Sequence, residues 1–171
     1  MLARLERTLA WQRARSILAV RLDNLGDVLL TTPALTALAD GGARKVTLLA
    51  SGAGAVVAAH VPAIADVVVF DAPWVAGRVG DPADERRLVA QLARRRFDAA
   101  VVFTVCTQSA LPAALLCRLA GIPLRAAYSR ENPYALLTDW VPDTDVCGPG
   151  MRHEVSRRLD LVQRGRHSCP R

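Results

Sequence analysis

The stretch RLDNLGDVLLTTPAL, residues 21–35, joins a short apolar run to a leucine-rich segment. Residues 17–22 are nearly all apolar, as expected for a strand that is covered on both faces. Residues 28–39 carry leucines on one helical face. Proline is tolerated only in the first turn of a helix, so Pro33 predicts a regular helix that begins near Thr32. The stretch is therefore a strand that leads through a turn into a helix.

The same alternation of apolar, β-branched runs and helical patterns continues along the chain, which is typical of a parallel sheet wrapped by crossover helices. Further strands are predicted at residues 46–50, 67–70, 99–103 and 125–128. Further helices are predicted at residues 84–96, 109–120 and 151–163. We therefore expect an α/β fold, a Rossmann-like parallel sheet with helices on both faces.

The 171 residues suit one domain of ordinary size. We expect that domain at residues 16–163, between a basic helical extension (1–15) and an irregular tail (164–171). No run reaches the ~18 apolar residues of a membrane span, and the arginine-rich start lacks the apolar core of a signal peptide. A cytoplasmic protein is therefore expected. The four cysteines show no CxxC spacing, which predicts core or surface thiols and no metal site.

The turn at residues 23–27 is where polar groups meet the end of the first strand, the place at which doubly wound folds bind ligands. It has a single glycine, Gly26, where the dinucleotide fingerprint needs three, and it lacks the Gly-Lys-Ser/Thr ending of a P-loop. Asp23 and Asp27 flank that glycine. A carboxylate here can accept a hydroxyl proton, but it can equally cap the helix. The residues alone leave both readings open.

The run RLDNLGDVLLTTPAL resembles the opening signature of family 9 glycosyltransferases, the lipopolysaccharide heptosyltransferases and their relatives. Segments farther along fall in that family's order: FDAAVVFT (97–104), YALLTDWV (134–141) and HEV (153–155). The resemblance covers about residues 16–163, and the opening motif is its specific part.

The resemblance implies the amino-terminal, acceptor-binding half of a two-domain GT-B enzyme of lipopolysaccharide biosynthesis. It makes Asp27 the general base that deprotonates the acceptor hydroxyl. The donor would be a nucleotide-sugar such as ADP-heptose, a substrate rather than a cofactor, and no cofactor or metal is expected. Nothing in the sequence corresponds to the donor-binding domain, so the chain is expected to be truncated and inactive alone.

The expected acceptor is an anionic saccharide or glycolipid, which would also place the protein at the inner face of the cell membrane. Arginine binds such anions through its planar fork, and hydroxyl and amide groups bind sugar hydroxyls. The net charge of +6 fits anionic partners, although GC-rich coding explains the arginines equally well. The predicted acceptor-binding residues are Asp23, Asn24, Gly26, Arg78, Thr104, Gln108 and Arg130.

Two other functions compete with the transferase. One is a non-enzymatic fragment or partner-binding α/β domain, suggested by the aperiodic ending RGRHSCPR. The other is nucleic-acid binding, which is disfavoured because aromatic residues make up only 5% and no reading motif occurs. No nucleic-acid partner is expected.

Overall fold

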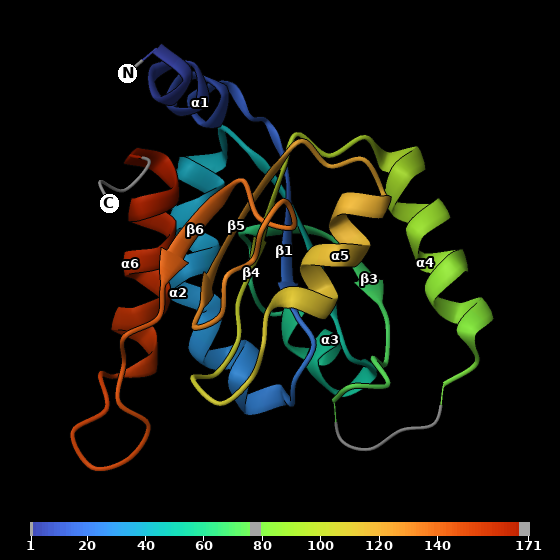
Figure 1. Ribbon diagram of the computed structural model, residues 1–171. Coiled ribbons are helices and arrows are strands. Elements are labelled where there is room, and N and C mark those ends of the chain that lie inside the picture. Colours follow the sequence, from blue (N-terminus) through green and yellow to red (C-terminus); the bar gives the residue numbers. More distant parts are fainter. Residues whose placement is uncertain (1, 76–79, 168–171) are drawn as a thin grey trace.

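The computed structural model describes residues 2–75 and 80–167 (Figure 1). Its strands are β1 (Ser16–Arg21), β2 (Lys45–Ala50), β3 (Ile64–Val69), β4 (Ala99–Val102), β5 (Leu124–Ser129) and β6 (Asp139–Pro142). Its α-helices are α1 (Leu2–Arg13), α2 (Leu25–Ala39), α3 (Gly52–Ala58), α4 (Pro82–Arg95), α5 (Leu111–Leu119) and α6 (Glu154–His167). A 3₁₀ turn, Asp40–Gly42, follows α2.

The strands form one parallel sheet in the order β3-β2-β1-β4-β5-β6. Helices α1, α2, α3 and α6 pack on one face, and α4 and α5 pack on the other (Figure 1). Along β1, Ile17 faces the first helix layer and Leu18 faces the second, and both are fully buried. Burial on both faces explains why this strand is a continuous apolar run. The expected fold class is confirmed.

Two elements were not predicted. Strand β6 lies in a segment that reads as turns, and it is a short edge strand with alternately buried and exposed residues. Helix α3 has the sequence GAGAVVA, whose glycines disfavour a helix. A Cβ at Gly54 would lie only 2.7 Å from a Val28 methyl carbon, so this glycine allows α3 to pack against α2.

The prediction that the first crossover helix begins near Thr32 is wrong. Helix α2 runs unbroken from Leu25, with Pro33 inside it. Proline cannot supply the N–H that would bond to the carbonyl of Leu29, four residues earlier. The Thr32 hydroxyl donates to that carbonyl instead (2.8 Å), so the oxygen keeps a partner and the helix continues.

Both ends of the described chain are more ordered than expected. In α1, the indole of Trp11 is buried and its Nε1 donates to Asp139 Oδ2 of β6 (2.9 Å). The amino-terminal helix is therefore part of the domain's core. Helix α6 extends to His167, so residues 164–167 are helical and not irregular.

The expectation of four free thiols is also wrong. Cys106, which follows β4, forms a disulfide with Cys147 in the segment between β6 and α6. Cys117 is a free, buried thiol whose pKa is raised by burial to about 12. Cys169 lies outside the described residues. Sequence spacing could not show the pair, because the two cysteines are 41 residues apart and meet only in the fold.

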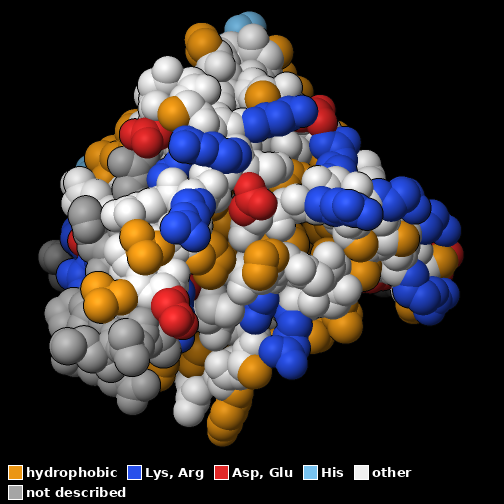
Figure 2. Space-filling model, turned by 90° about the horizontal axis from the view of Figure 1, so that it is seen from above, with side chains coloured by type: hydrophobic (Ala, Val, Ile, Leu, Met, Phe, Trp, Pro, Cys, Tyr) orange, Lys and Arg blue, Asp and Glu red, His pale blue; other side chains and the backbone are white. Residues whose placement is uncertain are grey.

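Basic side chains spread over the edge of the sheet at which the strands begin. Figure 2 looks onto this edge and shows many Lys and Arg side chains with few acidic ones between them. We call it the amino edge; its exposed basic residues are Arg13, Arg15, Lys45, Arg94, Arg96 and Arg118. None of the helices in the described part of the chain is long and apolar enough to cross a membrane.

Candidate functional site

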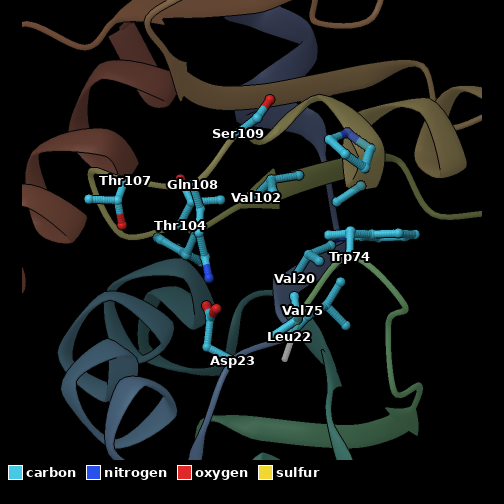
Figure 3. Close-up of a pocket in the computed structure, with 13 residues that line it drawn as sticks. Val20, Leu22, Asp23, Trp74, Val75, Val102, Thr104, Thr107, Gln108 and Ser109 are labelled. Atoms are coloured by element: carbon cyan, nitrogen blue, oxygen red, sulfur yellow. The ribbon is translucent and has the colours of Figure 1, made fainter. Parts of the chain in front are cut away.

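A cavity of about 260 Å³ opens at the other edge, beyond the carboxyl ends of β1 and β4 (Figure 3). The strand order reverses between these two strands, and open α/β sheets bind ligands at such a point. Its polar lining comprises Asp23, Thr104, Thr107, Gln108 and Ser109. Its apolar wall includes Trp74 and Val75.

A second cavity of about 150 Å³ adjoins the first. Leu22, Asp23 and Val75 line both, so Asp23 stands at the boundary between them. The remaining lining residues of the second cavity are Asn24, Ser51, Ala53, Asp71 and Ala72. The loops after β1, β2 and β3 therefore build one side of the site, and the loop after β4 builds the other.

Asp23 is held in place from beneath. Arg21, the last residue of β1, is fully buried, and its Nη1 lies 3.1 Å from Asp23 Oδ2. The Ser51 hydroxyl donates to the Asp23 carbonyl oxygen (2.6 Å). An ion pair below and a hydrogen bond to the backbone fix this carboxylate at the boundary between the cavities.

Asp27 lies in the first turn of α2, and its side chain is 18% exposed. Arg21 Nη2 lies 2.7 Å from its Oδ1, and Arg158 Nη2 from α6 lies 3.6 Å from the same oxygen. Neither oxygen of the carboxylate accepts a hydrogen bond from a described residue, so both arginines contact it as ion pairs. Asp27 is not among the residues that line either cavity, so the structure sets it beside the pocket and not within it.

Asn24, not an aspartate, caps helix α2. Its Oδ1 accepts a hydrogen bond from the backbone N–H of Asp27 (3.1 Å). A Cβ at Gly26 would lie 3.3 Å from this oxygen, which is closer than most such contacts, so glycine leaves room for the cap. Because Asn24 does the capping, the carboxylate of Asp27 is not needed for it.

Helix α6 brings two buried arginines to the site. Arg158 Nη2 pairs with Glu154 (2.9 Å) as well as with Asp27, and its Nη1 donates to the Asp27 carbonyl oxygen (3.2 Å). Burial, followed by the charge of Arg21, lowers the pKa of Arg158 to about 10, so it remains a cation near neutral pH. Arg157 pairs with Asp143 (2.7 Å) and donates to the carbonyl oxygen of Thr104 (2.6 Å).

The predicted residues Thr104 and Gln108 both line the larger cavity. The Thr104 side-chain hydroxyl and the Gln108 side-chain amide have no hydrogen-bond partner among the described residues. In Figure 3, Gln108 and Asp23 face each other from opposite walls of the cavity. Asp23, Thr104 and Gln108, predicted from separate stretches, are thus brought together.

Arg130 was predicted to bind the acceptor, and the structure shows its half-exposed guanidinium in contact with two neighbouring segments of the chain. It donates to the carbonyl oxygens of Cys106 (3.1 Å) and Asp145 and lies 3.8 Å from the Asp143 carboxylate. It lines neither cavity and instead ties the loop after β4 to the segment before α6. Arg78 lies outside the described residues.

Sequence reasoning missed the buried arginines and the tryptophan. Arg21 carries a signal, because a charge inside a buried apolar strand must meet an opposite charge. Arg158 carries no such signal in the sequence, because helix α6 contacts α2 only in the folded chain. Trp74 lies in a loop rich in proline and glycine, where the sequence does not indicate whether an aromatic side chain faces the site. No group of three or more metal-ligating side chains occurs among the residues that the structure describes.

The comparisons with solved structures find several with the same fold. E. coli ADP-heptose lps heptosyltransferase II aligns with a TM-score of 0.62 at 21% identity. A glycosyl transferase of family 9 from Veillonella parvula gives 0.66 at 16%, and E. coli heptosyltransferase WaaC with ADP-2-deoxy-2-fluoro heptose gives 0.64 at 19%. The chain shares the fold of these transferases.

The alignments cover 86%, 91% and 88% of this chain but only 40%, 42% and 48% of those three structures. The chain thus spans less than half the length of each of these transferases. No family model and no curated protein matches the sequence. At these identities the transferase fold is what the likeness shows, and the role of the site is argued from its geometry.

Proposed function

We propose that this chain is the acceptor-binding half of a glycosyltransferase that moves heptose or a related sugar from a nucleotide-sugar to a lipopolysaccharide-type or other glycan acceptor. The transferase fold and the opening motif support this reading. The observation that carries it is the setting of Asp27 in the first turn of α2, where two buried arginines form ion pairs with its carboxylate.

Asp27 is the general base of the proposed reaction. Its Oδ2 removes the proton from an acceptor hydroxyl as that oxygen attacks the anomeric carbon of the donor sugar, and the nucleoside diphosphate leaves. Arg21 and Arg158 form ion pairs with this carboxylate, which orients it and keeps it ionised until the hydroxyl arrives. General-base assistance of this kind contributes about 100-fold or more in rate.

The chain alone is expected to be inactive. Positioning the donor and stabilising the leaving diphosphate contribute most in many transfers, and the proposed donor domain would supply both. The proposal puts the reaction in the cytoplasm, with a peripheral position at the inner face of the membrane. The basic amino edge supports that position, because it would meet anionic lipid headgroups.

The test is a completed enzyme, made by joining the donor domain of a heptosyltransferase to this chain. Transfer of labelled heptose from ADP-heptose to lipopolysaccharide core fragments should appear, and Asp27→Asn should lower kcat at least about 100-fold. Asp84→Asn, on the exposed start of α4, is the matched control and should keep full turnover. Full activity in Asp27→Asn would end the assignment of the base.

A further inference from the structure

A disulfide ties the loop after β4 to the segment between β6 and α6. We propose that Cys106 and Cys147 are a reversible redox pair, in which Cys147 reacts with peroxide, Cys106 resolves the oxidised sulfur, and the disulfide holds the loop that lines the larger cavity. The pair is tested on this chain alone, so it stands or falls separately from sugar transfer.

Cys147 has the surroundings of a reactive cysteine. Its side chain is exposed, within residues 143–153, which form neither helix nor strand. Arg130 Nη2 lies 3.2 Å from its sulfur, and a nearby cation stabilises the thiolate, the nucleophilic form of cysteine. The Asp143 carboxylate lies farther from Arg130 (3.8 Å) and pairs more closely with Arg157 (2.7 Å). The positive charge of Arg130 therefore remains available to the sulfur.

Cys106 is placed to resolve an oxidised Cys147. It is only 6% exposed, and Met151 Sδ lies 3.5 Å from its sulfur, so a peroxide in solution meets Cys147 first. The Cα atoms of the two cysteines lie 6.2 Å apart, a separation that a disulfide spans without movement of the backbone. An accessible thiolate beside a resolving cysteine is the arrangement of redox-sensing pairs.

The chemistry needs hydrogen peroxide as oxidant and a dithiol as reductant. The Cys147 thiolate attacks a peroxide oxygen and breaks the O–O bond; the sulfur becomes a sulfenic acid, and the other oxygen takes up a proton and leaves as water. The Cys106 thiol then attacks that sulfur, which forms the disulfide and releases a second water. A dithiol returns both cysteines to thiols by exchange and is itself oxidised to a disulfide.

The bond acts on the loop that lines the larger cavity. Thr104, Thr107 and Gln108 flank Cys106 in this loop, and all three line the cavity. The loop has neither helix nor strand, and its internal turn is closed by a hydrogen bond from the Gln108 N–H to the Val105 carbonyl oxygen (3.1 Å). Reduction removes the covalent tie to the segment before α6, so the loop should open more often.

The first experiment identifies the reactive sulfur, with Cys169→Ser in every sample because Cys169 lies outside the described residues. The chain is reduced with dithiothreitol and then given a stoichiometric amount of hydrogen peroxide. Mass spectrometry should find the cross-link between Cys106 and Cys147 and a free thiol at Cys117. In Cys106→Ser, dimedone should trap a sulfenic acid at Cys147; in Cys147→Ser, trapping at Cys106 should be at least about 10-fold lower. Equal trapping, or no cross-link, overturns the pair.

Alkylation of the reduced chain, which needs no cysteine of the pair to be replaced, tests the cation. Iodoacetamide should react with Cys147 faster than with Cys106, and Arg130→Gln should slow the reaction at Cys147 by about 3- to 10-fold. Arg87→Gln, which removes a 67% exposed charge on α4, should leave that rate unchanged. Equal rates in the two variants would overturn the role of Arg130 and with it the reactive thiol.

Hydrogen exchange tests the hold on the loop. The Gln108 amide should exchange at least about 10-fold faster in the reduced chain than in the oxidised chain. The matched control is the His60 amide, which donates to the Val57 carbonyl oxygen (3.0 Å) in a similar turn after α3 and should exchange equally in both states. No acceleration at Gln108, or the same acceleration at both amides, would overturn the effect on the cavity.

Discussion

Arg21 and Arg158 leave almost no side-chain surface exposed, and both reach the carboxylate of Asp27. Burying a guanidinium is costly, and the cost is offset only where carboxylates lie close by. Asp23, Asp27 and Glu154 provide three of them. Removing one member leaves an uncompensated charge, so these residues depend on one another for stability as well as for geometry.

Arg158→Ala tests this dependence. The change leaves Glu154 and Asp27 without their shared partner and should lower the free energy of unfolding by about 3 kcal/mol, measured by urea denaturation. Arg164→Ala on the same helix is the control. Arg164 is 44% exposed and pairs with Asp160, so its loss should cost less than about 1 kcal/mol. Equal losses of unfolding free energy in the two variants would mean that burial does not strengthen the ion pairs of Arg158.

Asp160 gives the protein a pH dependence. Burial opposes its ionisation, but hydrogen bonds from Tyr128 (2.6 Å), Arg164 (2.8 Å) and Arg152 (3.0 Å) outweigh burial and lower the pKa of Asp160. A carboxylate with a lower pKa in the folded state stabilises the fold above its unfolded pKa of ~3.9. That contribution is lost as the pH falls through the folded value.

Asp160→Asn should therefore lower the urea midpoint clearly at pH 6 and by much less at pH 2, where the wild-type carboxylate is becoming protonated. Chemical denaturation at both pH values measures the difference. The same loss at both would show that the Asp160 charge does not act through these hydrogen bonds.

At the residue scale, the sequence predicted part of the site. Asp23 and Thr104 could be predicted because each directly follows a buried strand, and parallel strands end at one edge. The contacts of Arg130 with backbone carbonyl groups could not be predicted, because an arginine in a loop looks the same in sequence whether it meets a ligand or backbone carbonyls. Its partners depend on the path of residues 143–150, and the turn residues in that segment do not predict where it runs in the fold.

At the scale of elements, strong periodicity decided what could be predicted. Five of the strands are apolar runs and were expected within a few residues of their bounds. Strand β6 was not predicted because an edge strand needs no continuous apolar run. Helix α3 was not predicted because its glycines, which lower helix propensity, are there to allow close packing against α2. Helix α1 was predicted as an extension, and only the burial of Trp11 shows its attachment.

Trp11→Ala tests whether α1 belongs to the folding unit. The indole fills space between α1 and β6 and donates to Asp139, so its removal should cost about 3 to 5 kcal/mol in thermal or urea unfolding. Leu9→Ala, on the exposed side of the same helix, should change stability by no more than about 0.5 kcal/mol. A small effect of Trp11→Ala would mean that α1 docks without contributing to the core.

Basic side chains gather at one edge of the whole molecule. The exposed arginines lie at the amino edge (Figure 2), whereas Arg21 and Arg157 at the carboxyl edge are buried and paired with Asp23 and Asp143. Parallel strands and their crossover helices produce this arrangement when helices end in arginines and begin with acids, as α4 does. The domain should thus orient in an electric field, with the amino edge toward an anionic surface.

Sedimentation with phosphatidylglycerol vesicles measures binding of the chain to an anionic surface, and variants of the two ends of α4 test its orientation. The chain should bind at ~10 mM salt and be released at several hundred millimolar, since screening shortens the reach of exposed charges. Replacing Arg94 and Arg96 with glutamate should abolish binding at low salt, whereas the same change at Arg86 and Arg87, in the first half of α4, should weaken it less. Equal losses of vesicle binding in the two double variants would indicate that net charge drives binding without a preferred orientation.

The bond between Cys106 and Cys147 has a mechanical consequence. It closes α5, β5 and β6 into a covalent ring, so tension applied to the two ends of the chain passes through the sulfur atoms and never reaches the residues between them. An optical trap should record a final contour length shorter by roughly 15 nm than that of the reduced chain, from 41 residues at ~3.6 Å each. Strands β5 and β6 would stay tethered as one loop while β1, β2, β3 and β4 are drawn out.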